Sequence, residues 1–210
     1  MPKRKAVEPY HHGNLRQALL EVSLDVLAER GLADFSLRAV ARAAGVTTGA
    51  PYHHFADRAE LLAALAEVAF ADLASKLRAS QAAVSAPARL RSMTLAYLAF
   101  ARDNPVRYSL MYLPEIENRT RFASLHATAW RCMEEVVEAL ALALPAASRN
   151  ELLARGLGVW AACHGYAALQ LGGVLDNRPE LPAQRTLAEA LVDQIQRGAL
   201  GETRQPRSQT

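Results

Sequence analysis

The sequence predicts an all-α protein, and three observations support this prediction. Alternating apolar and polar runs are almost absent, as are the Asn-Gly and Asp-Gly pairs that turn β-hairpins. Apolar residues recur instead at helical spacing, as Leu15, Leu19, Val22 and Val26 do at i, i+4, i+7 and i+11. Hydrophobic residues make up 51% of the 210-residue chain and charged residues 21%, so the helices can bury a core.

The first two helices are bounded by recognisable end signals. A helix over about 15–30 places Arg30 in its last turn and lets Gly31 take the left-handed position that follows a helix. Ser36 is a good N-cap for a second helix of about two turns, which Gly45 ends. The spacing therefore predicts a long helix, a short connection and a short helix.

Two further helix starts follow closely along the chain. Thr47 or Thr48 caps another short helix, which runs to about Phe55. Asp57 then opens a longer helix, with Glu60 three residues later as in a capping box. Proline residues separate the remaining helices, which are expected at about 88–103, 106–113, 118–144, 148–175 and 183–198.

This spacing divides the chain into four parts. We expect a basic flexible arm over 1–12 and a small three-helix domain over 13–57. A larger helical domain over 58–198 and a disordered polar tail over 199–210 complete the chain.

Composition narrows the class of protein further. The net charge of +3 permits a polyanionic partner without requiring one. Two cysteines cannot build a disulfide framework, and no apolar signal segment follows the basic start, so we expect a cytoplasmic protein. The uncharged segment 156–175 is just long enough to span a bilayer. We expect it instead to be a helix buried between its own domain and a partner subunit, with no membrane partner.

The two short helices on either side of Gly45 have the form of a helix-turn-helix, whose second helix can enter the major groove of DNA. Hydroxyls at its start can bond phosphate or base, and small residues let the backbone approach the groove. Arginines flank the unit, and the basic N-terminal arm suits phosphates or a minor groove. The residues predicted to bind double-stranded DNA are Lys3, Arg4, Lys5, Ser36, Arg38, Thr47, Thr48, Gly49, Ala50, Tyr52, His53 and Arg58.

Residues 14–65 resemble the DNA-binding domain of the TetR family of bacterial transcriptional repressors. The resemblance rests on Ala28, Gly31, Ser36, Arg38, Val40, Ala41, Ala44, Gly45, Val46, Gly49, Tyr52, His54, Phe55, Arg58 and Leu61. It implies that residues 47–50 together with Tyr52, His53 and Arg58 meet DNA. Pro51 departs from the family's pattern, but a first helical turn tolerates proline, so we expect the recognition helix to persist.

The larger domain resembles the C-terminal ligand domain of one TetR subgroup, named for its Trp-His-Gly residues. Trp160, His164, Gly165, Gly172 and Gly173 carry this resemblance. It implies a small-molecule effector rather than a bound cofactor. Aromatic residues, histidines and one methionine are predicted to line its pocket. They are Tyr108, Met111, Tyr112, Phe122, His126, Trp130, Trp160 and His164.

A stripe of small side chains predicts where two copies of the chain meet. Small residues at i, i+4, i+7 and i+11 let another helix approach closely, and the last helix adds an apolar face for a four-helix interface. The residues predicted in this homodimer interface are Ala161, Gly165, Ala168, Gly172, Leu187, Leu191 and Ile195. A dimer sets two recognition helices about 34–36 Å apart and predicts a pseudo-palindromic operator.

Enzyme and metal functions find no support in the sequence. Adjacent helical residues point about 100° apart, so Cys163 and His164 cannot form a thiolate-imidazole pair. The histidine pairs at 11–12 and 53–54, and His126 with Cys163, lack a metal-ligand spacing. The sequence thus predicts a ligand-released transcriptional repressor. A helical small-molecule-binding protein with a vestigial DNA-binding domain and a TetR-type activator remain as alternatives.

Overall fold

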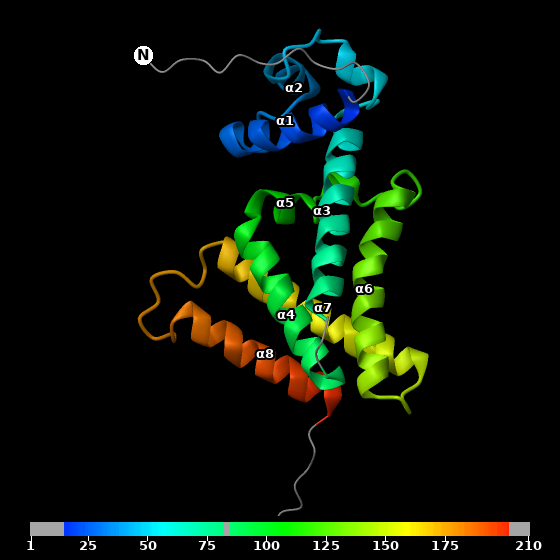
Figure 1. The fold of residues 1–210 in the computed structure, drawn as a ribbon. Coiled ribbons are helices and arrows are strands. Elements are labelled where there is room, and N and C mark those ends of the chain that lie inside the picture. Colours follow the sequence, from blue (N-terminus) through cyan, green and yellow to red (C-terminus); the bar gives the residue numbers. More distant parts are fainter. Residues whose placement is uncertain (1–14, 82–84, 202–210) are drawn as a thin grey trace, which may run out of the picture.

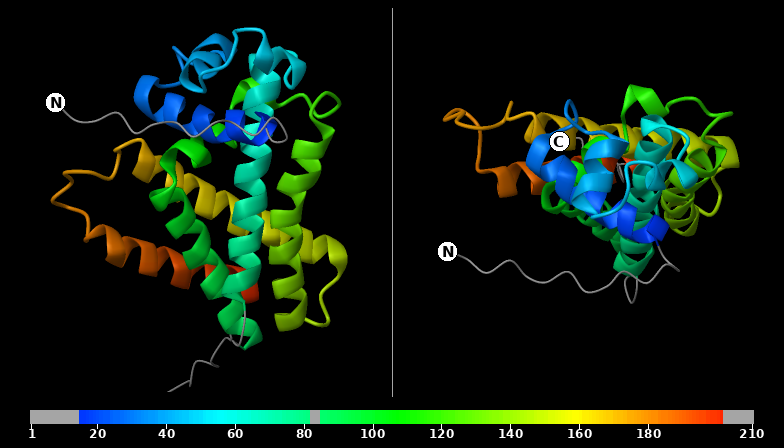
Figure 2. Two further views of the ribbon diagram at one scale, coloured as in Figure 1. Left: turned by 45° about the horizontal axis from the view of Figure 1, so that its top comes forward. Right: turned by 90° about the horizontal axis from the view of Figure 1, so that it is seen from above.

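The first three helical segments form a small unit at one end of the molecule (Figure 1). In the computed structural model, which describes residues 15–81 and 85–201, these segments are α1 (Leu15–Arg30), α2 (Leu37–Ala43) and the 3-10 helix η1 (Ala50–His53). Seen from above, this unit lies over the end of the remaining helices (Figure 2). The predicted helix ends at Arg30 and Ser36 are confirmed, since Ser36 accepts the backbone N–H of Ala39 at 3.2 Å.

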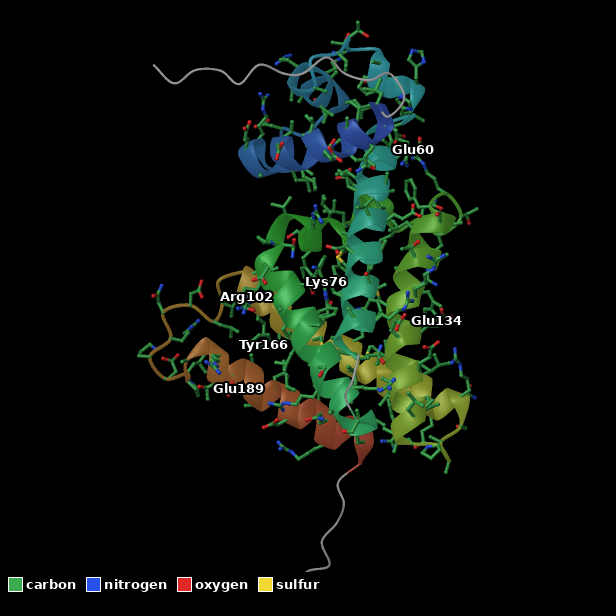
Figure 3. The ribbon with its side chains drawn as sticks, viewed as in Figure 1. Glu60, Lys76, Arg102, Glu134, Tyr166 and Glu189 are labelled. Atoms are coloured by element: carbon green, nitrogen blue, oxygen red, sulfur yellow. The ribbon has the colours of Figure 1, made fainter. Side chains whose placement is uncertain are left out.

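Helix α3 (Arg58–Ser80) joins this unit to the larger bundle and runs through its centre (Figure 1). It begins where the sequence predicts, because the Asp57 carboxylate accepts the N–H of Glu60 at 2.9 Å. The Glu60 carboxylate in turn accepts the N–H of Ala56 at 2.6 Å, which satisfies a second backbone donor ahead of the helix. Figure 3 labels Glu60 at this junction between the two units.

Around α3 pack the other helices of the bundle. Their bounds are α4 (Ala86–Asp103), α5 (Pro105–Leu110), the 3-10 helix η2 (Pro114–Ile116), α6 (Ala123–Ala143), α7 (Arg149–Leu171) and α8 (Gln184–Leu200). Apolar side chains of α3 that are almost fully buried, such as Leu61, Phe70 and Leu73, form the middle of the core. The described residues contain no strand, so the prediction of an all-α fold is confirmed.

Several predicted boundaries differ from the structure; for example, the helix expected at 106–113 ends at Leu110. The helix predicted from 118 begins only at Ala123, because a turn that starts at Asn118 comes first. In this turn the side chain of Asn118 accepts the N–H of Arg121 at 2.9 Å. The helix predicted to reach 175 ends at Leu171, since Gly173 adopts a φ of +70°. Helix α8 continues to Leu200, so residues 199 and 200 belong to it rather than to a tail.

Helix α7 is covered by its own chain on one side only. Leu152, Val159 and Cys163 are buried, whereas Leu157 and Leu169 expose 62% and 45% of their surface. Burial of the 156–175 segment on all sides, as the sequence predicts, therefore requires a partner. Within the described residues, no helix has the length and apolar character needed to cross a membrane.

Candidate DNA-binding surface and interior cavity

The turn that follows α2 is held by backbone hydrogen bonds. Gly45 adopts a φ of +69°, the left-handed conformation that glycine reaches without strain. The N–H of Gly45 donates to the Arg42 carbonyl at 3.3 Å, and the N–H of Val46 donates to the Ala41 carbonyl at 3.0 Å. This pair of bonds is a Schellman motif, which ends the helix and turns the chain toward η1.

The second short helix is shorter and tighter than the sequence predicts. A helix from Thr47 or Thr48 to Phe55 was expected, whereas the structure contains a single 3-10 turn over Ala50–His53. Pro51 lacks an N–H, so it cannot donate to the Thr47 carbonyl, which instead accepts the N–H of Ala50 at 3.0 Å. Pro51 is buried, and the expectation that an α-helix persists through it is wrong.

A polar, exposed face surrounds this 3-10 turn. Tyr52 exposes 50% of its surface. The other predicted DNA-binding residues that are exposed on this unit are Arg38, Thr47, Thr48, Gly49 and His53. Ala50 is half-buried, and Phe55 is buried below the face. The geometry thus presents hydroxyl, imidazole and guanidinium groups on one short segment and its neighbour α2.

Two features of this face correct or extend the sequence prediction. Ser36 is half-buried and its hydroxyl is engaged as the N-cap of α2, so its first role is structural. Arg42 is exposed in the last turn of α2 and was missed, although it lies four residues after Arg38 and so on the same helix face. The predicted arm residues Lys3, Arg4 and Lys5 lie outside the described residues.

Arg58, which is predicted to meet DNA, also has partners within its own chain. Its Nε donates to the Phe35 carbonyl at 3.0 Å and one terminal nitrogen donates to the Leu32 carbonyl at 2.8 Å. The other terminal nitrogen pairs with the carboxylate of Glu115 in η2. Each nitrogen of the guanidinium already has an acceptor, so the structure assigns Arg58 to holding the small unit against the bundle.

A second ion pair crosses the same junction, and here the acidic residue belongs to the start of α3 and the basic residue to the bundle. Arg121, just before α6, donates to the carboxylate of Asp57 at 2.5 Å. This hydrogen bond, together with the backbone bond from Glu60, lowers the pKa of Asp57 below its ordinary value. The start of α3 is therefore fixed to the bundle through one acidic and one basic side chain.

Three tyrosines and one histidine form a hydrogen-bonded chain inside the bundle. The hydroxyl of Tyr97 lies 2.9 Å from that of Tyr112 and 3.1 Å from that of Tyr108. The hydroxyl of Tyr108 lies 2.7 Å from Nδ1 of His164. Burial raises the pKa of Tyr108 to about 12 and raises the pKa of Tyr97 and Tyr112 as well, so all three stay neutral.

A small apolar cavity of about 20 Å³ adjoins this chain. Trp160 lines it together with Tyr97, and the other lining residues are Leu77, Met93, Thr94, Cys132, Val136, Val159 and Cys163. Burial raises the pKa of both cysteine thiols to about 12, so neither is a reactive thiolate. The structure therefore brings Tyr108, Tyr112, Trp160 and His164 of the predicted pocket to one place.

The remaining predicted pocket residues are dispersed. Met111 and Phe122 are buried core residues that do not line this cavity. Trp130 exposes 49% of its surface on α6, so the prediction that it lines the interior is wrong. His126 is half-buried, and its Nε2 is buried without a hydrogen-bond partner among the described residues.

The predicted interface residues also divide into two groups. Ala161, Gly165, Ala168 and Gly172 are exposed along one face of α7. In α8, Leu187 and Leu191 are half-buried, but Ile195 exposes only 7% because it packs inside its own chain. The prediction that Ile195 meets a partner is therefore corrected.

The described part of the chain contains no group of three or more His, Cys, Asp or Glu side chains able to hold an ion together. The interior cluster instead combines hydroxyls with one imidazole, whose pKa is lowered by burial. A helix-turn-helix face joined to a helical bundle with an interior cavity is the architecture of a DNA-binding transcriptional regulator.

Comparison with known proteins shows which family of regulators this is. Residues 19–65 match the family of bacterial regulatory proteins called the tetR family, and residues 90–195 match the tetracyclin repressor-like C-terminal domain. The chain belongs to the TetR family of transcriptional regulators. The predicted Trp-His-Gly subgroup remains a prediction.

Individual relatives agree with this assignment. The regulator AcrR of Shigella flexneri is 42% identical over 53 residues, and a regulator of Mycobacterium tuberculosis is 33% identical over 97 residues. These matches span 25% and 42% of the two relatives and 25% and 45% of this chain. A solved structure from Rhodococcus sp. RHA1, of unknown function, is 32% identical with a TM-score of 0.73, covering 91% of this chain and 98% of that one.

Proposed function

We propose that this TetR-family regulator is a repressor that binds a pseudo-palindromic operator as a homodimer and leaves it when a small molecule binds the bundle. The exposed face around η1 is the observation on which the proposal rests. Tyr52, His53 and the threonines at 47 and 48 remain accessible there, while Pro51 and Phe55 anchor the segment from below. Such polar groups can bond phosphate oxygens and base edges.

The homodimer is supported by the uncovered side of α7. Alanine and glycine residues recur on this side at alternating spacings of four and three residues, from Ala154 through Gly158 and Ala161 to Gly172. All of them are exposed. Leu157 and Leu169 flank this stripe and are also uncovered. A second copy that packs its own α7 here buries both leucines and sets two η1 faces for successive major grooves.

The junction between the two units supplies a route by which a ligand changes DNA affinity. Tyr112 belongs to the interior hydroxyl chain, and Glu115 follows it by only three residues. Glu115 pairs with Arg58, which holds the carbonyls of Leu32 and Phe35 in the connection between α1 and α2. A ligand that moves Tyr112 therefore shifts the orientation of the small unit, and it favours the state in which the two faces no longer match the DNA.

The test is a nuclease footprint of the purified chain on the DNA flanking its own gene, followed by fluorescence anisotropy on the protected segment. We expect a protected pseudo-palindrome whose log affinity falls linearly with log salt concentration. Tyr52→Ala and Arg38→Ala should weaken binding about tenfold each, as expected for a lost phosphate or base contact. The matched control is Arg131→Ala, an exposed arginine of α6 far along the chain from the face.

The outcomes separate the proposal from its alternatives. Unchanged affinity in Tyr52→Ala and Arg38→Ala, or an equal loss in Arg131→Ala, would overturn the proposed face. Absence of any footprint would favour a small-molecule-binding protein with a vestigial DNA-binding domain. A reporter gene placed behind the protected segment distinguishes repression from activation.

A further inference from the structure

We propose that the cavity beside the tyrosine chain binds an uncharged molecule that carries a single hydroxyl group, for which phenol is a simple probe. The proposal deepens the function above, since it rests on the bundle being the effector domain and names the chemical class of the effector. Three features of the interior lead to it: the chain of hydrogen-bonded hydroxyls, the absence of charge along the cavity wall, and the size of the cavity.

Each link of the chain joins one donor to one acceptor. A tyrosine hydroxyl can take either role, because it carries one proton and two lone pairs. Tyr97 is at the centre of the chain and lies within hydrogen-bond distance of the hydroxyls of both Tyr108 and Tyr112. Tyr108 and Nδ1 of His164 form the last link, in which a neutral imidazole can also take either role.

Every hydroxyl of this chain can both donate and accept a hydrogen bond. A guest with a hydroxyl can be inserted between two members without leaving either of them unpaired, because it too accepts one bond and donates one. A carboxylate or a ketone only accepts, so inserting it leaves one neighbour with no donor to accept from. An unpaired polar group in a buried site costs about 1–3 kcal/mol, so the chain selects for a hydroxyl.

The wall of the cavity excludes a charged guest. No charged residue is among the nine that line it, and apart from the threonine, the tyrosine, the indole and the two thiols they are aliphatic or methionine side chains. The nearby acidic residue Glu135 is already held by Arg78 and Gln81. A carboxylate or ammonium group entering here would lose its hydration without gaining an ionic partner.

The size of the cavity sets how the guest enters. The cavity has a volume of about 20 Å³, which holds roughly one water molecule. This volume is too small for an aromatic ring, so the cavity has to widen when such a guest binds. Met93 is an unbranched, flexible side chain on the wall and can yield, whereas the aromatic rings of the chain are packed against one another. Room for a guest therefore comes from movement of Met93, and a guest that takes the place of Tyr112 as the partner of Tyr97 displaces Tyr112, which Glu115 follows by three residues.

The experiment uses the full chain carrying Trp130→Phe, so that Trp160 in the cavity wall is the only tryptophan. Its fluorescence is titrated with three probes of similar size: phenol, toluene and benzoate. We expect phenol to change the Trp160 signal with an affinity about tenfold above that of toluene, and benzoate to produce no saturable change. Met93→Ala, which enlarges the cavity, should strengthen binding of phenol and toluene alike.

Tyr97→Phe removes the central hydroxyl of the chain and should reduce phenol to the affinity of toluene. Tyr166→Phe is the matched control, because this tyrosine of α7 lines a surface groove instead of the cavity. Equal affinities of phenol and toluene for the starting protein, or saturable binding of benzoate, would overturn the proposal without any need for a variant. These titrations contain no DNA, so they test the ligand class alone, whereas a missing footprint would overturn the regulatory function alone.

Discussion

The guanidinium of Arg58 and the carboxylate of Glu115 form an ion pair that links the two units of the molecule. The same guanidinium holds the backbone carbonyls of Leu32 and Phe35, so one side chain ties together α3, η2 and the connection between α1 and α2. Exposed ion pairs contribute little stability on their own, but the two hydrogen bonds from Arg58 to backbone carbonyls of the α1–α2 connection fix the orientation of that connection relative to α3.

Arg58→Lys should destabilise the protein although it keeps the charge. An ammonium group cannot reach two carbonyls and a carboxylate with the fork geometry of a guanidinium, so acceptors lose their donor. We expect a loss of about 1–3 kcal/mol in the free energy of unfolding, measured by denaturant titration. Glu115→Gln leaves both backbone bonds intact and should cost less than about 1 kcal/mol. Equal losses in the two variants would show that the ion pair, rather than the backbone bonds, holds the junction.

The imidazole of His164 should make the free energy of unfolding depend on pH. Burial lowers the pKa of His164 below its ordinary value of 6.5, so as the pH falls through that value the unfolded chain binds a proton before the folded chain does. Stability present above this window, which begins near the ordinary value of 6.5 and extends downward, is therefore lost as the pH falls. Denaturant titrations at several pH values should show that the free energy of unfolding changes less with pH for His164→Gln than for the unchanged chain. The lowered pKa of Asp57 acts only below its ordinary value of 3.8.

The sequence predicts the local structure of this protein well where one residue decides it. Ser36 and Asp57 can be recognised as helix caps from the sequence. Each has a side-chain oxygen that can accept the backbone N–H three residues later, where the first turn of a helix leaves N–H groups without a partner. Gly45 can be recognised as the turn because a left-handed conformation favours glycine. The helix-turn-helix and its exposed face follow from these few positions.

What the sequence does not predict depends on contacts between distant segments. Arg58 resembles a DNA contact by position, and only the approach of η2 brings Glu115 to it. Trp130 and Trp160 are alike as residue types, but one lies on the outside of α6 and the other lines the cavity. Glu134 of α6, labelled in Figure 3, is likewise exposed, whereas its neighbour Glu135 is 6% exposed. Helical period alone cannot fix which side of a helix its neighbours cover.

The two thiols should be unreactive in the folded protein. Cys132 and Cys163 are buried, and burial raises the pKa of each to about 12, so almost no thiolate exists at neutral pH. We expect labelling by a thiol-specific reagent to be slow in native buffer and to become fast in denaturant. Rapid labelling of either cysteine under native conditions would show that the cavity opens frequently without a ligand.

Leu157→Glu should separate the proposed dimer into monomers. This leucine is 62% exposed beside the small-residue face of α7, and a buried carboxylate without a partner would oppose association. Sedimentation velocity should show the mass of one chain for this variant and twice that mass for the unchanged protein. Leu142→Glu is the matched control, since Leu142 is 56% exposed on α6, outside the proposed interface. A dimer that survives Leu157→Glu, or one that Leu142→Glu disrupts, would place the interface elsewhere.

Gly45→Ala should weaken the helix-turn-helix without touching its exposed face. The φ of Gly45 is +69°, and an added methyl group would meet no atom within 4 Å, so the whole cost is backbone strain. A left-handed conformation costs a residue with a side chain about 1–2 kcal/mol, and we expect a loss of that size in the free energy of unfolding. Gly49→Ala is the control, because Gly49 has a φ of −83° and equal space around it. If both variants lose the same stability, the left-handed turn is not what the glycine at 45 provides; if only Gly45→Ala does, the turn depends on its backbone conformation.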